Sequence, residues 1–243
     1  MLDMSPSGDA GESSERLTAR DWCLLALLVP LGFGLTALVV FWPSGSWRWW
    51  RGWLWLGLVV AVWVASFAAL IRFNASLVRR RMRVGPGTKA WDRVLLGVFR
   101  LTFGGQIAVA GLDAVRYGWA PMGPAWIAVG LVLLLPGSAL FICAMAANAF
   151  FEGTVRIQHD RGHRVVDTGP YALVRHPGYI GFGAFAAGTS FVLGSWWSLL
   201  PAAGAILLLV GRTALEDRTL QRELQGYAEY TGRVRYRLVP GIW

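Results

Sequence analysis

Long apolar runs separated by short polar segments form the dominant pattern along the chain. A helix that crosses a bilayer takes about 20 predominantly apolar residues. Runs of about this length cover residues 22–42, 52–71, 94–115 and 124–147. The pattern therefore predicts four membrane-spanning helices before the first long polar segment.

A fifth apolar run, residues 179–211, is 33 residues long, which is too much for one ordinary crossing. Gly194-Ser195 lies near its middle and favours a turn. We therefore expect two short helices in a tight hairpin, with one long tilted helix as the alternative. The predicted fold class is all-α: a polytopic integral membrane helical bundle of about six transmembrane helices, followed by a C-terminal cytoplasmic helical segment.

The same pattern divides the chain into three parts. Residues 1–20 are rich in Ser, Gly, Asp and Glu, lack an apolar run, and are expected to be a disordered cytoplasmic tail. Residues 21–147 hold the four N-terminal transmembrane helices. Residues 148–243 combine a polar loop, the helical hairpin and a C-terminal helix, and we expect the catalytic region here.

Basic residues are distributed unevenly between the two sides of this arrangement. In the six-helix arrangement, 19 of the 23 Lys and Arg residues fall on one side. The positive-inside rule then places both termini and the polar loop in the cytoplasm, with the helices in a cytoplasmic (inner) membrane. The basic residues interrupt the membrane spans and do not form one soluble basic face, so the lipid bilayer is an expected partner and nucleic acid is not.

The polar loop contains all three histidines of the chain within residues 156–181. Gly169-Pro170 and Pro177-Gly178 interrupt helix on either side of a short segment, and such irregular backbone is expected at the mouth of a membrane bundle. Cys23 and Cys143 both lie in apolar runs, so neither is placed to join the histidines around a metal. We expect no metal site.

Arg212 and Glu216 follow the last apolar run and are four residues apart, which makes them neighbours on a helix surface. An exposed intrahelical ion pair of little energetic value accounts for this spacing. Alternatively, both residues belong to a site, because the six-helix arrangement places them at the same membrane face as His176 and Tyr179.

Two sequence blocks resemble the isoprenylcysteine carboxyl methyltransferase family, which is itself similar to the phospholipid N-methyltransferases of membranes. One block is GPYALVRHPGYIG at 169–181, with Gln158 upstream. The other is RTALED at 212–217, followed by Leu220, Gly226-Tyr227, Tyr230 and the ending RLVPGIW. The resemblance covers about the last ninety residues, and the first half of the chain matches only as a set of helices.

This resemblance implies a site for S-adenosylmethionine on the cytosolic side and a lipidic substrate that enters between membrane helices. It assigns Arg212 to the substrate and, with Glu216, to the catalytic pair. The cofactor contacts that it implies are Gln158, His163, Arg164, Val165, Val166, Tyr171, His176, Pro177, Gly178, Tyr179 and Glu216. The loop from Gln158 to Tyr171 is shorter here than in the eukaryotic members, and Asp217 stands where those have a second Glu.

The predicted function is thus an integral membrane methyltransferase that moves a methyl group from S-adenosylmethionine to a hydrophobic small-molecule or lipid-linked acceptor. A carboxylate acceptor suits Arg212, whose planar guanidinium can hold an anion in line. One alternative is a membrane NADPH-dependent sterol-type reductase, which shares the Arg-His-Pro-x-Tyr element; another is a non-catalytic membrane scaffold or carrier. The sequence leaves the acceptor atom (O, N or S) and the oligomeric state open.

Overall fold

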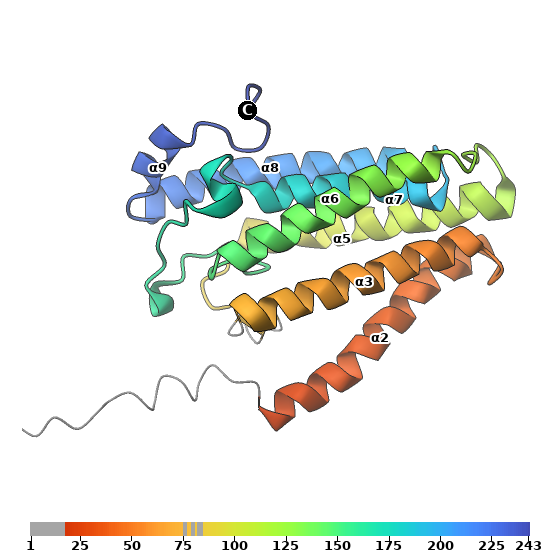
Figure 1. The fold of residues 1–243 in the computed structure, drawn as a ribbon, viewed down its shortest axis with the longest axis horizontal. Coiled ribbons are helices and arrows are strands. Elements are labelled where there is room, and N and C mark those ends of the chain that lie inside the picture. Colours follow the sequence, from red (N-terminus) through yellow and green to blue (C-terminus); the bar gives the residue numbers. More distant parts are fainter. Residues whose placement is uncertain (1–17, 75–76, 79–80, 82–84) are drawn as a thin grey trace, which may run out of the picture.

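The computed structural model describes residues 18–74, 77–78, 81 and 85–243. All the regular elements in these ranges are helices, as predicted (Figure 1). The long ones are α2 (Ala19–Ser44), α3 (Trp50–Phe73), α5 (Ala90–Gly111), α6 (Trp126–Ala147) and α8 (Leu199–Glu223), with the shorter α7 (Pro177–Leu193) and α9 (Tyr227–Arg233). The predicted disordered tail, residues 1–20, lies almost wholly outside the described residues, and α2 begins at Ala19 behind a capping box formed by Thr18 and Asp21.

The five long helices are each long and apolar enough to cross a membrane. The chain is therefore an integral membrane protein with several helical spans. α7 has 17 residues, or about 26 Å at 1.5 Å per residue, which is short for a bilayer core of about 30 Å. The prediction of about six spans thus corresponds to five long helices and the shorter α7, which runs beside them (Figure 1).

The hairpin predicted within residues 179–211 is confirmed, and the alternative of one tilted helix is wrong; of the two helices expected to be short, only α7 is, because α8 continues to Glu223. α7 ends at Leu193, and α8 begins at Leu199. Between them Gly194 adopts φ +83°, a left-handed conformation that favours glycine, and a Cβ there would lie only 1.8 Å from a guanidinium nitrogen of Arg51. The turn therefore needs glycine for both its backbone conformation and its contact.

α6 and α7 pack with their backbones in close contact. A Cβ on Gly137 would lie 2.7 Å from the carbonyl oxygen of Gly181, and one on Gly188 would lie 2.7 Å from that of Gly130. Small residues at such contacts let membrane helices approach closely. This packing holds α7, which carries Tyr179, against the centre of the bundle.

At the end of the bundle that contains the α7–α8 turn, a buried carboxylate joins two chain segments by hydrogen bonds. Asp113 lies in the π-helical turn Leu112–Tyr117 that follows α5, is 0% exposed, and accepts hydrogen bonds from the Ala120 N–H and the Ser195 hydroxyl, both at 2.6 Å. Exposed tryptophans gather in the segments at this end, as expected near lipid headgroups: Trp47, Trp119, Trp196 and Trp197.

The opposite end of the bundle carries the polar loop and the C-terminal segment (Figure 1). α8 continues without a break from its apolar half to Glu223, so Arg212 and Glu216 lie on the same helix as the last span. α8 ends at Glu223, and Gly226, with a left-handed φ of +80°, precedes α9. The last span thus extends directly into the predicted site.

Candidate active site

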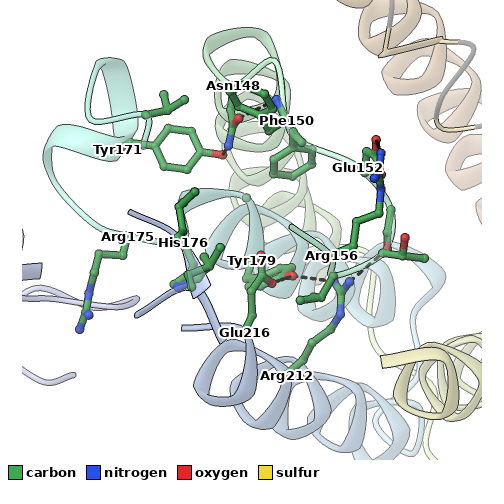
Figure 2. Close-up of a pocket in the computed structure, with 18 of the residues that line it drawn as sticks. Asn148, Phe150, Glu152, Arg156, Tyr171, Arg175, His176, Tyr179, Arg212 and Glu216 are labelled. Carbon is green, nitrogen blue, oxygen red and sulfur yellow. Dashed lines mark hydrogen bonds and ion pairs between the residues drawn. The ribbon is translucent and has the colours of Figure 1, made fainter. Parts of the chain in front are cut away.

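One pocket opens where the polar loop meets the ends of α5 to α8 (Figure 2). Its polar side is built by the loop after α6 and includes Asn148, Glu152, Arg156, Gln158, His163 and Tyr171. Its apolar side is built by the helices and includes Leu95, Leu96, Phe99, Phe141, Phe182, Leu208 and Leu209. The pocket can therefore receive a polar group from the loop side and an apolar group from among the helices.

Tyr179, Arg212 and Glu216 lie where these two sides meet (Figure 2). The Tyr179 hydroxyl donates a hydrogen bond to the Glu216 carboxylate and accepts one of 2.6 Å from Nη1 of Arg212. The guanidinium carbon of Arg212 also lies 5.2 Å from the centre of the Tyr179 ring. The interpretation of Arg212 and Glu216 as a simple intrahelical ion pair is wrong, because a tyrosine hydroxyl stands between them.

Arg212 forms its ion pair with Asp92, at the start of α5. Its Nε donates to Oδ1 of Asp92 at 2.7 Å, and its Nη2 donates to the carbonyl oxygen of Gly153 at 3.0 Å. Asp92 is 0% exposed. The charge of Arg212 is thus offset inside the protein by Asp92, and the carboxylate of Glu216 lines the pocket separately.

Glu216 has one hydrogen-bond partner among the described residues, the hydroxyl of Tyr179, which binds Oε2. Its other oxygen is available to a positively charged ligand group. The stacked rings of His176 and Tyr179, with centres 5.7 Å apart, lie beside this position. A carboxylate next to aromatic faces suits a ligand cation.

Asp217, the next residue, has a structural role outside the pocket. It is 0% exposed and is not among the residues that line the pocket. It accepts from the Tyr227 hydroxyl at 3.0 Å and from Nε of Arg237 at 2.8 Å, and Nε2 of His176 lies 3.3 Å away. Asp217 therefore ties the loop, α9 and the C-terminal segment to α8.

The C-terminal segment also holds the loop through backbone hydrogen bonds. The N–H groups of Arg175 and His176 donate to the carbonyl oxygens of Tyr236 and Arg237, each at 2.9 Å. The Tyr230 hydroxyl donates to the carbonyl oxygen of Tyr171 at 2.7 Å. These bonds fix the part of the loop that faces the pocket.

Gln158 and His163 order the first part of the loop. The side-chain amide of Gln158 donates to the Phe150 carbonyl oxygen at 2.8 Å and accepts from Arg161 at 2.9 Å. Burial and the nearby charge of Arg156 lower the pKa of His163 to about 4. Its imidazole is therefore neutral at pH 7, and Nδ1 can accept the 3.3 Å hydrogen bond from the Gln158 N–H.

The structure brings together all but one of the residues that the sequence assigned to the site. The pocket is lined by Gln158, His163, Arg164, Val165, Val166, Tyr171, His176, Gly178, Tyr179, Arg212 and Glu216. Pro177 is the exception: it begins α7 as a buried residue and does not line the pocket. Their individual roles stay predictions.

Sequence reasoning missed several residues around the pocket: Asp92, Asn148, Phe150, Glu152 and Arg156. Arg156 is buried and makes two hydrogen bonds, of 2.8 and 2.9 Å, to Glu152. The four-residue spacing of that pair gave a signal, as did the position of Asp92 next to the third apolar run. Asn148 and Phe150 carry no sequence signal of this kind. In the described ranges no group of three or more His, Cys, Asp or Glu residues could hold a metal ion.

A sequence model of the isoprenylcysteine carboxyl methyltransferase (ICMT) family matches residues 128–222. This region begins in α6 and contains the whole polar loop, α7 and nearly all of α8. Over this region the chain is similar to the family. Most of the pocket, including Tyr179, Arg212 and Glu216, lies in the family region, whereas Asp92 lies outside it.

Curated relatives in the ICMT family resemble parts of the chain. A probable protein-S-isoprenylcysteine O-methyltransferase of Oryza sativa is 36% identical over 66 residues, which are 27% of this chain and 35% of the relative. The human protein-S-isoprenylcysteine O-methyltransferase is 30% identical over 118 residues, or 45% of this chain and 40% of the relative. The Schizosaccharomyces pombe enzyme is 29% identical over 125 residues, or 47% and 50%. The chain thus spans from a third to a half of the length of these relatives.

A solved structure supports the fold over a larger part of the chain. The structure of the eukaryotic intramembrane Ras methyltransferase ICMT matches with a TM-score of 0.54 at 16% identity, covering 86% of this chain and 74% of that one. At this identity the match shows the fold alone. It extends the likeness to helices that the family region does not include.

Proposed function

We propose that the protein transfers a methyl group from S-adenosylmethionine to the carboxylate of a hydrophobic, lipid-like acceptor. The observation that carries this proposal is the division of one pocket into a polar and an apolar side that meet at Tyr179, Arg212 and Glu216. A two-substrate reaction between a water-soluble cofactor and a lipid needs such a junction. The match of residues 128–222 to the family model supports the same reaction.

The residues present fit this cofactor. S-adenosylmethionine carries an ammonium, a carboxylate and a polar nucleoside, and it supplies an electrophilic methyl group on a sulfonium. Glu216 can bind a ligand cation through its oxygen without a protein partner, and the rings of Tyr171 and Tyr179 can contact a sulfonium or an adenine. Gly178, which also lines the pocket, packs against the Phe151 ring so closely that a Cβ there would lie 2.7 Å from it.

The apolar side of the pocket fits a chain of isoprenoid type. Its walls come from four helices, and Phe99, Phe141 and Phe182 form part of one aromatic cluster in which Phe182 lies 5.2 Å from Phe99 and 6.1 Å from Phe141. The names of the curated relatives specify isoprenylcysteine as their substrate. We infer an acceptor of that class, an S-isoprenylated cysteine or a similar lipidic acid, for this chain.

Methylation of a carboxylate requires little acid–base catalysis by the protein. The nucleophile is already ionised, so no general base is required. The reaction joins a positive and a negative centre into neutral products, and a site of low dielectric constant therefore does not hinder it. Arg212 presents Nη1 beside Tyr179 and can orient an anionic acceptor, so positioning accounts for most of the rate.

The pocket end of the bundle is proposed to face the cytoplasm. In the six-helix arrangement derived from the sequence, 19 of the 23 Lys and Arg residues fall on the same side as the polar loop. This orientation gives the pocket access to a water-soluble cofactor and to lipid at the same time. A cytoplasmic membrane location follows from it.

Isothermal titration calorimetry on detergent-purified protein tests the proposal. S-adenosylhomocysteine, the product form of the cofactor, is expected to bind, and NADPH is not. Binding of NADPH alone would favour the membrane reductase instead, and binding of neither ligand would favour a scaffold or carrier. The Glu216→Gln variant serves as the control for the site, because it removes the negative charge that can pair with the ammonium of the ligand and should weaken binding of S-adenosylhomocysteine.

A further inference from the structure

Asp92 is buried beside the pocket without lining it. It lies in the first turn of α5, is 0% exposed, and receives two hydrogen bonds from Arg212, at 2.7 Å from Nε and 3.4 Å from Nη2. Its Oδ2 also accepts from the Val155 N–H at 2.7 Å. One carboxylate thus connects α5, the polar loop and α8.

The arrangement leaves Arg212 a single orientation. Asp92 occupies the Nε and Nη2 edge of the guanidinium, and the Gly153 carbonyl oxygen occupies the rest of Nη2. Nη1 is the nitrogen that remains, and it donates to Tyr179 with one of its two hydrogens. A guanidinium at the end of a flexible side chain needs such a fixed partner to keep its planar fork in place.

The charge of Arg212 also needs Asp92. Arg212 is only 8% exposed, and an unpaired charge at such a position is costly. Glu216, one turn further along α8, would be the natural replacement for a missing Asp92. With Asp92 in place, Glu216 keeps its bond to Tyr179 and its second oxygen stays available.

We propose that Asp92 is a positioning residue for the methyl transfer, which acts by holding Arg212 toward Tyr179 and the acceptor. The inference rests on the proposed function and adds a residue from outside the region that the family model matches. It predicts that Asp92 affects turnover mainly through Arg212, whereas its bond to the Val155 N–H, which an asparagine oxygen can also accept, holds the loop. A purely structural Asp92 would affect the amount of folded protein and leave each folded molecule active.

Asp113 offers a matched control for that structural alternative. It is an equally buried aspartate that follows the same helix, accepts three hydrogen bonds from Ala120, Ser195 and Trp197, and lies at the end of the bundle away from the pocket. The Asp113→Asn variant should lose stability without loss of turnover per folded molecule. The Asp92→Asn variant should lose both stability and turnover per folded molecule.

The test is a double-mutant cycle with Asp92→Asn, Arg212→Lys and the combined variant, measured as kcat and KM for the acceptor in lipid nanodiscs. Asp92→Asn is expected to lower kcat roughly 10²-fold, the effect of a misplacement of about 1 Å. If Asp92 acts through Arg212, the combined variant should be little slower than the slower single variant. If the kcat losses of the two single variants multiply in the combined variant, the proposal is overturned. Wild-type turnover in Asp92→Asn would also overturn it.

A second readout does not depend on activity. Phenylglyoxal, which modifies accessible guanidinium groups, is applied to the ligand-free protein, and labelling of Arg212 is quantified by peptide mass spectrometry. Labelling should rise several-fold in Asp92→Asn and stay unchanged in Asp113→Asn; equal labelling in all three proteins would contradict the role of Asp92. If Asp92→Asn fails to fold, Asp92→Glu keeps the charge but shifts it by one methylene, and it should retain stability while lowering kcat. If the wild-type protein is inactive but labelling of Arg212 rises in Asp92→Asn as expected, the proposed methyl transfer is contradicted while the pairing of Asp92 with Arg212 is supported.

Discussion

Arg212 and Glu216 show how far single residues can be interpreted from their spacing. Their separation of four residues correctly predicts that they share a helix face. The expected ion pair does not form, because Arg212 finds Asp92 and Glu216 finds Tyr179. Both partners come from other helices, and neither could be identified without the fold.

The two residues should therefore respond differently to conservative substitution. Glu216→Gln keeps a hydrogen bond to Tyr179 but removes the negative charge, so it should weaken S-adenosylhomocysteine binding by about 1.5–3 kcal/mol, the value of a hydrogen bond to a charged group. Arg212→Lys cannot reach Asp92, Gly153 and Tyr179 together, so it should largely keep this affinity and lose turnover. Calorimetry and initial-rate measurements on both variants decide. Normal affinity and turnover in both would remove the pair from the site.

Most of the residues assigned to the site could be predicted at the residue scale because they lie in two short blocks with a family pattern. The position of Asp92 gave a signal, but it did not identify a site residue, since an acidic residue near the start of an apolar run also serves helix capping and the helix dipole. Pro177 was assigned to the pocket and is absent from its lining. It begins α7, where a proline is favoured for its backbone conformation alone.

At the scale of elements, the loop is held in place by the segment that follows α9. Arg237 reaches the buried Asp217 at 2.8 Å, whereas the side chain of Arg235 is exposed and only its backbone carbonyl is used, by Arg175. The guanidinium of Arg237 also lies over the Trp243 ring, 4.8 Å from its centre, so the two arginines share a chain segment and a charge but differ in their side-chain contacts.

Arg237→Ala should lower the free energy of unfolding by about 1–3 kcal/mol, the cost of losing a charged hydrogen bond, and should weaken S-adenosylhomocysteine binding. The reason is that Asp217 also anchors His176 and Tyr227, so a looser carboxylate loosens the loop. Arg235→Ala should change neither quantity. Denaturant titration and calorimetry provide the measurements, and identical behaviour of the two variants would show that the segment does not organise the loop.

The long helices could be predicted to within a few residues because apolar length alone defines them. The hairpin in residues 179–211 was predictable from Gly194, whose left-handed backbone ends α7. The pairing of residues 236–237 with residues 175–176 was not, because it consists of backbone hydrogen bonds between segments about sixty residues apart. Backbone hydrogen bonds of this kind do not depend on the type of side chain, so the sequence does not indicate them.

At the scale of the whole molecule, the arrangement of the helices makes a prediction about orientation. The polar loop and the Trp119 segment lie at opposite ends of the bundle (Figure 1). His159 and Trp119 are both exposed. In a background of Cys23→Ala and Cys143→Ala, the His159→Cys variant should be protected from a membrane-impermeant maleimide added to intact cells.

The Trp119→Cys variant, in contrast, should be labelled from outside the cell, because its segment is expected on the far side of the membrane from the cofactor. Permeabilisation should expose the His159→Cys site. Labelling of the loop variant in intact cells would overturn both the orientation and the cytosolic cofactor supply. The charge distribution along the sequence made this prediction possible before any helix was placed.

Methyl transfer to a carboxylate held at the junction of the two sides of the pocket can be tested directly. Its most direct test incubates the protein in nanodiscs with S-adenosylmethionine labelled in the methyl group and an S-farnesylated cysteine derivative as the acceptor. A methyl ester releases labelled methanol on treatment with alkali, whereas methylated amines and thioethers keep the label. We predict alkali-labile label with the wild-type protein and almost none with Glu216→Gln at low cofactor concentration. Label that resists alkali, or no transfer at all, would contradict the account.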